Sequence, residues 1–295
     1  MKTYLECVPC FFRQALEAAR LCKADEVMQK KIMDKVALLL PTFSLEASPP
    51  EMGKKIHEVI KRLTGVDDPY LDIKNNSNIF ALRLYDKFKK KAENSKDSLF
   101  TAVEMAIAGN VIDFGVKNSV NVEKELEKIL AEESKAIKKE NEDLFAYGEF
   151  REALENCRDL LYLADNTGET VFDRILIEEI VKRGISVEYV VKEKAIINDA
   201  LTEDAVFCGI DKIAKVSSSG SDAPGTVLSI CSDVFIEKFK KADMVISKGQ
   251  GNFEALSSRL ERPVFFLFMA KCPVVVKDIG CGLGDTLLLK RGDKK

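Results

Sequence analysis

The 295-residue sequence has little of what several classes of protein require. Its formal net charge of -3 does not suit a protein that binds nucleic acid by neutralising phosphates with a basic surface. No apolar run approaches the ~20 residues that cross a bilayer. The N-terminus lacks the basic, apolar and small-residue zones of a signal peptide. We therefore expect a cytoplasmic protein that binds neither nucleic acid nor membranes.

The sequence is also poor in the ligands of a zinc site. It has one histidine, His57, and its eight cysteines include a single C-x-x-C pair, Cys7 and Cys10. A tetrahedral zinc site needs about four ligands, and cysteines of a chain without a secretion signal stay mostly reduced. Three interpretations of this pair stay open: packing residues on an N-terminal helix, a structural or accessory metal or redox site, or catalytic residues.

Two nucleotide-binding signatures are missing as well. No G-x-G-x-x-G follows the first strand-like run, and Lys248 lacks both the preceding glycine loop and the following Ser or Thr of a P-loop. The stretch VVVKDIGCGLGDTLLL, residues 274–289, mimics the S-adenosylmethionine loop of a methyltransferase. Because no βαβ unit fits in the few residues after Gly282, we interpret this stretch as a closing loop.

What is present is a change of pattern along the chain. Residues 1–150 repeatedly place apolar residues at spacings of three and four, which predicts helices, with a Glu- and Lys-rich solvated helix and connector over 120–150. After about residue 155, short apolar runs alternate with amphipathic ones, which predicts a mostly parallel sheet covered on both faces. We expect an α/β fold with a Rossmann-like sheet sandwiched by helices, preceded by an all-helical domain. The expected domains are 1–150 and 151–295.

Polar residues follow four of the predicted strands. Ligands of open parallel sheets bind at the carboxyl ends of the strands, so these residues are expected at one edge. The first strand ends in Asp165 and Asn166, and the second leads to Asn198 and Asp199. The third runs into the Ser- and Gly-rich loop SSSGSDAPGT, and the fourth carries Lys248.

The residue types at these strand ends predict a metal–phosphate site. Asp165, Asn166 and Asp199 offer hard oxygen ligands, which suit Mg²⁺ or Mn²⁺. Lys248 is a compact positive charge for a phosphate, and the glycines after it allow a ligand to approach the backbone. Taken singly, Asp165 to Gly168 and Asn198–Asp199 are equally well interpreted as turns and helix caps, and Lys248 as a solvated lysine.

Several motifs in order are quite specific together: ECVPCFFRQAL, AGNVIDFG, LADNTGE, INDALTEDA, GSDAPGT, SKGQGNFEAL and KCPVV. With them the whole chain resembles the domain of unknown function 89 family, metal-dependent damage-control phosphatases, and most of all its short archaeal and bacterial branch.

The resemblance implies a set of site residues. Its metal ligands map onto Asp165, Asn166 and Asp199, for a divalent Mg, Mn, Co or Ni ion, and its phosphate-site lysine maps onto Lys248. Asp165, Lys248 and Glu169 are the expected catalytic residues. The helical-domain motif implies Asn110 and Asp113 over the site, with a buried helix cap as the alternative for both. The expected substrate-binding residues are Asn110, Asp113, Gly168, Asn198, Ser221, Gly249, Gly251 and Asn252.

The implied activity is hydrolysis of phosphate esters of small metabolites, either sugar phosphates or damaged phosphometabolites. Because the D-x-D-x-T pattern of aspartyl-phosphate phosphatases is absent, we favour attack by water over a covalent intermediate on Asp165. Two alternatives remain: a carboxyl methyltransferase that uses S-adenosylmethionine, and a non-catalytic metal or redox module on Cys7 and Cys10, with Cys272. The sequence chooses neither the substrate nor an oligomeric state.

Overall fold

The computed structural model describes residues 1–110, 127 and 143–292. Asp113 and most of the helix expected over 120–150 lie outside this part of the chain. In the described part, the helices are α1 (Cys7–Leu21), α2 (Glu26–Leu39), α3 (Pro49–Thr64), α4 (Leu71–Glu93), α5 (Ser98–Ala108), α7 (Tyr147–Glu155), α8 (Glu169–Val181), α9 (Thr202–Phe207), α10 (Asp233–Lys241), α11 (Gln250–Leu256) and α12 (Pro273–Ile279). None of these helices is both long and apolar enough to span a membrane.

The strands of the described residues form one six-stranded sheet in the order β3-β2-β1-β4-β5-β6. Strands β1 to β5 pair in parallel, and β6 pairs with β5 in the antiparallel direction. The strands are β1 (Asp159–Leu163), β2 (Ser186–Val191), β3 (Lys215–Ser218), β4 (Met244–Lys248), β5 (Val264–Met269) and β6 (Thr286–Arg291). The expected α/β fold with a mostly parallel sheet is confirmed.

The carboxyl-terminal segment differs from the expected closing loop. Residues 274–289 contain most of α12, a turn, and the start of β6. Both Gly280 and Gly284 have positive φ, at 84° and 89°, which ends the helix and turns the chain back to the sheet. The glycines thus connect a helix to an edge strand, whereas a cofactor loop connects a strand to a helix.

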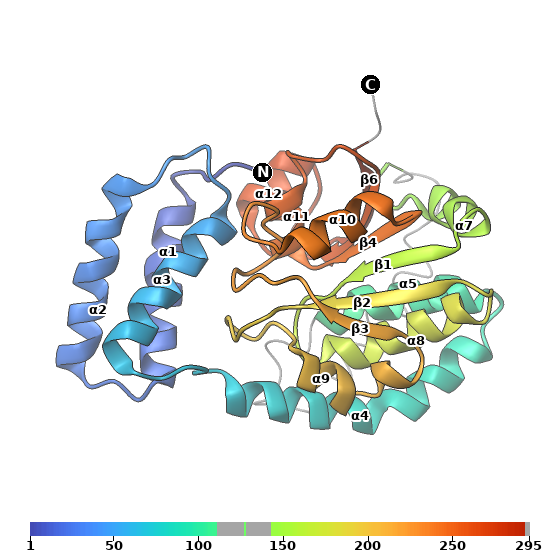
Figure 1. The fold of residues 1–295 in the computed structure, drawn as a ribbon, viewed down its shortest axis with the longest axis horizontal. Helices are drawn as coiled ribbons and strands as arrows, with labels where there is room; N and C mark the ends of the chain where they lie inside the picture. Colours follow the sequence, from blue (N-terminus) through green and yellow to red (C-terminus); the bar gives the residue numbers. More distant parts are fainter. Residues whose placement is uncertain (111–126, 128–142, 293–295) are drawn as a thin grey trace.

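Both faces of the sheet are buried, as a parallel sheet requires. Side chains alternate along β1, so that Leu160 and Tyr162 belong to one apolar cluster while Leu161 and Leu163 belong to the other. Helices α4, α5 and α8 contribute to the first cluster; α10, α11 and α12 contribute to the second (Figure 1). The sheet therefore holds the loops at its ends on a rigid support.

Helices α1, α2 and α3 stand together beside the carboxyl ends of the strands (Figure 1). Their apolar faces join the second cluster, and Lys54 of α3 forms an ion pair with Asp222, in the loop after β3, at 2.6 Å. A capping box of Ser48 and Glu51 starts α3, with Pro49 at its first position. Helices α1 and α3 thus cover the edge where ligands are expected, and α2 packs against both of them. The domain boundary near residue 150 stays a prediction.

Candidate active site at the carboxyl edge of the sheet

The loop after β1 turns sharply into α8. Gly168 has φ 79°, a conformation that favours glycine, and α8 begins at Glu169. This turn holds the Asp165 and Asn166 side chains beside each other, with Asn166 Nδ2 donating to Asp165 Oδ2 at 2.9 Å. The two side chains are 7% and 8% exposed. Both face the cleft described below rather than open solvent.

The loop after β2 lies against this turn. Asn166 and Asp199 form a backbone bridge, Ala200 N donates to Asp165 O at 2.8 Å, and Thr167 N donates to Asn198 O at 3.0 Å. Asp199 Oδ2 is also 3.6 Å from Lys192 Nζ. The two loops thus bring Asp165 and Asp199 to one edge of the sheet, and the metal-ligand set stays a prediction.

The donors in these loops suit a hard divalent cation. Burial raises the pKa of Asp165 well above its ordinary value, and the nearby carboxylates of Glu169 and Asp199 raise it further. A positive charge between Asp165 and Asp199 would relieve this repulsion. Within the described residues, no three His, Cys, Asp or Glu side chains are arranged to hold a metal. The candidate set is two carboxylates and one amide, with coordination left for water and phosphate.

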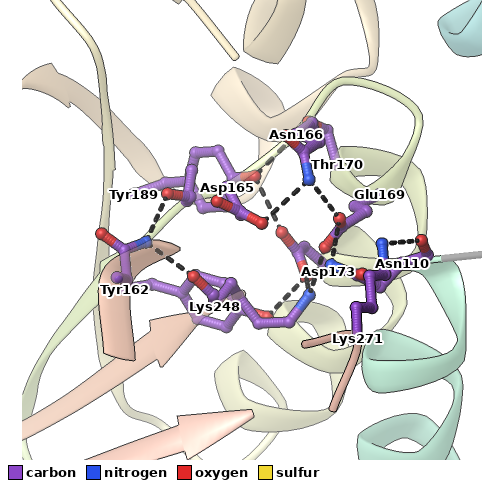
Figure 2. A network of polar contacts seen from close by, with 12 residues as sticks. Asn110, Tyr162, Asp165, Asn166, Glu169, Thr170, Asp173, Tyr189, Lys248 and Lys271 are labelled. Atoms are coloured by element: carbon purple, nitrogen blue, oxygen red, sulfur yellow. Dashed lines mark hydrogen bonds and ion pairs between the residues drawn. The ribbon is translucent and has the colours of Figure 1, made fainter. Parts of the chain in front are cut away.

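Lys248 lies deeper than expected. Its side chain is fully buried, and its Nζ donates to Asp173 Oδ1 at 2.6 Å and to Glu169 Oε2 at 3.2 Å (Figure 2). The hydroxyls of Tyr162 and Tyr189 donate to the Asp173 carboxylate at 2.7 and 2.9 Å. Burial alone would lower the pKa of Lys248, but Asp173 and Glu169 raise it overall. Lys248 is thus a charged member of a buried cluster beneath the loops.

Glu169 connects this buried cluster to the cleft. Its Oε1 accepts hydrogen bonds from Asn166 Nδ2 at 2.8 Å and from Asn110 Nδ2 at 2.6 Å. Lys271, just after β5, donates from Nζ to Asn110 O at 2.8 Å (Figure 2). Asn110 lies two residues after the end of α5, so the helical half of the chain reaches the cleft.

A cavity of about 360 Å³ lies between the strand ends and helices α1 and α3. Asp165, Asn166, Asn198, Asp199 and Gly251 line it together with Asn110 and Lys271. Cys7, Phe11 and Pro50 lie on its helical side. Polar groups therefore face an apolar wall across a space large enough for a small metabolite.

Other expected binding residues have supporting positions instead. Asn252 is fully buried and donates to the carbonyls of Ala164 and Lys248 at 3.0 and 2.6 Å. Ser221 is also fully buried, with Oγ accepting from Ala223 N. Gly249 packs against Asp165, since a Cβ there would lie 1.8 Å from Asp165 Oδ2. These residues shape the loops, and they are absent from the lining of the cavity.

The N-terminal cysteines lie at the cleft as well. Cys7 is buried and Cys10 exposed, both are free thiols, and Cys272 lines the same cavity. Burial raises the pKa of both Cys7 and Cys10, which keeps these thiols protonated. The structure thus brings Cys272 to the same cavity as the pair.

Three residues near the site were not predicted from the sequence: Asp173, Lys271 and Asn78. Asp173 follows Glu169 by four positions on α8, so both lie on one helix face. Lys271 follows β5. It could have been predicted from the rule that ligands bind at the carboxyl ends of parallel strands, because the fifth strand ends just before it. Asn78, on α4, has no comparable local signal.

Comparisons with known proteins find similarity over almost the whole chain. The model of the damage-control phosphatase ARMT1-like domain matches residues 3–287. The chain is 36% identical over 282 residues to a damage-control phosphatase of Pyrococcus horikoshii, covering 95% of this chain and 94% of that one. It is 32% identical over 287 residues to a damage-control phosphatase of Archaeoglobus fulgidus, covering 97% and 98%.

A solved structure extends the similarity to three dimensions. The crystal structure of a DUF89 family protein from Pyrococcus horikoshii has a TM-score of 0.88 and 33% identity, covering 99% of this chain and all of that one. An uncharacterised protein of Methanocaldococcus jannaschii is 36% identical over 293 residues, covering 97% of this chain and 94% of that one. The similarity extends over both the helical half and the sheet.

Proposed function

Since this chain belongs to the damage-control phosphatase ARMT1-like domain family, we propose that it is a metal-dependent phosphatase that hydrolyses phosphate monoesters of small metabolites. The observation that carries the proposal is the pairing of the Asp165 and Asp199 loops at the edge of a metabolite-sized cleft. Relatives named damage-control phosphatases support the reaction class. Sugar phosphates and damaged phosphometabolites are the substrates we would test first.

Asp165, Asn166 and Asp199 would hold the divalent cation, with Mg²⁺, Mn²⁺, Co²⁺ and Ni²⁺ as candidates. When bound, the ion supplies a Lewis acid that withdraws charge from a phosphate ester. The three side chains line the cleft, and the backbone bonds between their loops hold them at a set spacing.

We assign the phosphate contact to Lys271 rather than Lys248. Lys271 lines the cleft, whereas Lys248 is fully buried in contact with Asp173 and Glu169. An ammonium group beside the metal-binding loops stabilises the negative charge that develops on the phosphoryl oxygens. Lys248 and Glu169 then act as positioning residues, because Glu169 orients the amides of Asn110 and Asn166.

The carboxylates of Asp165 and Asp199 are placed to accept a proton from an attacking water, since both line the cleft. The oxygen of that water bonds to phosphorus, and the ester oxygen leaves with its electron pair. The leaving oxygen takes up the proton from the carboxylate, so that inorganic phosphate and an alcohol result. A covalent phosphoryl-Asp165 intermediate is the alternative, and a radiolabelled phosphoryl group retained on the acid-quenched enzyme would detect it.

The test is a panel of phosphate esters with each of the four metal ions and with a chelator. We expect metal-dependent phosphate release that falls to the uncatalysed rate in Asp165→Ala and in Asp199→Ala. Asp34→Ala, on the exposed face of α2, is the matched control and keeps full activity. Activity that survives both site substitutions would refute the proposed ligand set.

The methyltransferase alternative loses support from the fold, because its glycines follow a helix and precede an antiparallel strand. Methyl transfer from S-adenosylmethionine that is indifferent to chelator would restore it. The module alternative predicts stoichiometric metal bound through Cys7 and Cys10, without phosphate release.

A further inference from the structure

The buried side chain of Asn78, on helix α4, connects the two proposed metal-binding loops. Gly168 N donates to Asn78 Oδ1 at 2.8 Å, and Asn78 Nδ2 donates to Asp204 Oδ1 at 2.9 Å. Asn78 is 1% exposed and Asp204 is 5% exposed. Because solvent is excluded, each lost hydrogen bond here would leave a buried polar group without a partner.

Asp204 carries the connection to the second loop. Its Oδ2 accepts from Leu201 N at 2.9 Å, and Leu201 is two positions after Asp199. Lys74 Nζ lies 3.4 Å from Asp204 Oδ2 and 3.1 Å from Asp68 Oδ2. Lys74 thus balances the buried charge of Asp204 from the same face of α4, one helical turn before Asn78.

The two loops are therefore held at both ends. Backbone bonds join them at Asp165 and Ala200, and the Asn78–Asp204 pair joins them again at Gly168 and Leu201. The orientation of the Asn78 amide follows from its partners, since a backbone N–H needs an oxygen and a carboxylate needs an N–H. One acceptor and one donor are required at this position.

We propose that Asn78 and Asp204 are positioning residues of the metal site: they set the separation of Asp165 from Asp199. This inference rests on the proposed function for the identity of the ligands. Residues that orient metal ligands typically contribute tenfold to hundredfold to metal affinity. Asn78 and Asp204 would act on affinity through the loops, without touching the ion.

Two near-isosteric substitutions and their combination test the idea. Asn78→Asp keeps the acceptor for Gly168 but places a carboxylate against Asp204. Asp204→Asn lacks one of the two acceptors that Leu201 and Asn78 require. The double variant Asn78→Asp/Asp204→Asn restores every donor–acceptor match, with the carboxylate and amide exchanged.

The measurement is Mn²⁺ affinity by isothermal titration calorimetry, with thermal melting of the metal-free protein beside it. We expect each single variant to bind Mn²⁺ about tenfold or more weakly, and the double variant to recover to within about threefold of wild type. Ser98→Ala, which removes a hydrogen bond to Glu179 between α5 and α8, is the control and keeps wild-type affinity. Asn78→Ser replaces Asn78→Asp if the latter does not fold.

The outcomes separate this inference from the proposed function. Single variants that melt earlier but bind Mn²⁺ with wild-type affinity would show a purely structural role and overturn the inference. Wild-type affinity in Asp165→Ala would instead refute the ligand set. A wild-type protein that binds no Mn²⁺ would overturn both.

Discussion

At the residue scale, Gly249 shows how closely the site is packed. It has φ 80°, and a Cβ atom there would lie 1.8 Å from Asp165 Oδ2 and 2.7 Å from Oδ1. No side chain fits without moving the Asp165 carboxylate. Contact with the Asp165 loop, as well as the local turn, therefore explains why position 249, just after β4, is a glycine.

Gly249→Ala should displace Asp165 and reduce phosphatase activity by about 10²-fold, the effect of a misplacement of about 1 Å at a reacting centre. Gly280→Ala is the control for a side chain at a positive-φ glycine, because Gly280 has φ 84° but, among the described residues, no atom within 4 Å of its added Cβ. The backbone strain differs between the two positions: Gly280, at ψ 37°, is left-handed helical, which costs an alanine about 1 kcal/mol. Gly249, at ψ 158°, lies in a region that is essentially reserved for glycine, so strain adds to the clash with Asp165. Steady-state assays that find equal losses in the two variants would contradict the packing argument.

At the scale of elements, the first turns of α8 join the buried ion cluster to the cleft. Glu169 and Asp173 lie on one face of this helix, and Lys248 at the end of β4 bonds to both. The ion cluster thus ties helix α8 to the neighbouring strand directly beneath the Asp165 loop. Lys271, by contrast, follows β5 and lies at the cleft surface.

Lys248→Met and Lys271→Met should have opposite effects: the first should mainly lower stability, and the second should mainly lower activity. Lys248→Met leaves two buried carboxyl groups without their cation and should lower the free energy of unfolding by about 3–5 kcal/mol. Lys271→Met should change stability by less than about 1 kcal/mol but lower kcat/KM by about 10²-fold. Chemical denaturation and steady-state kinetics on both variants measure the difference. A stable Lys248→Met enzyme with a raised KM would instead return the phosphate contact to Lys248.

At the scale of the whole molecule, α1, α2 and α3 share an apolar cluster with the sheet, so their packing contributes to global stability. His57 of α3 is buried, and among the described residues its Nε2 has no hydrogen-bond partner. Burial lowers the pKa of His57 from 6.5 to about 4. Charged residues line the small pocket beside it: Lys54, Glu58, Lys61, Asp67, Asp68, Lys194 and Asp222.

His57 should make the protein less stable in acid. Between pH 6.5 and 4 the unfolded chain binds a proton at His57 that the folded protein does not, so the free energy of unfolding falls as the pH falls. The contribution of neutral His57 to the free energy of unfolding is fully present above pH 6.5, and it should decrease by about 2 kcal/mol by pH 5.

His57→Leu has no such proton and should lose correspondingly less stability between pH 7 and pH 5. Urea denaturation of both proteins at the two pH values measures this difference, in which other titrating groups cancel. Equal losses in the two proteins would mean that the His57 ring reaches solvent in the folded state.

The helices, the strands and the polar strand ends followed from the sequence, because each depends on local periodicity or on the common direction of parallel strands. These two rules bring Asp165 and Asp199 to one edge without any knowledge of side-chain packing. The same reliance on local pattern explains why residues 274–289 were wrongly expected to form a loop. An antiparallel edge strand such as β6 is defined by its partner β5, and its own glycine-flanked residues give a weak signal.

The sequence by itself determined the fold class and the two acidic loops at the carboxyl edge of the sheet. The tertiary structure alone decided that Lys248 is buried beneath those loops, that Lys271 faces the cleft, and that Asn78 connects the loops from a distant helix. The physical reason is that the depth and the partners of a side chain depend on elements far away in the chain, which no local pattern of residues encodes.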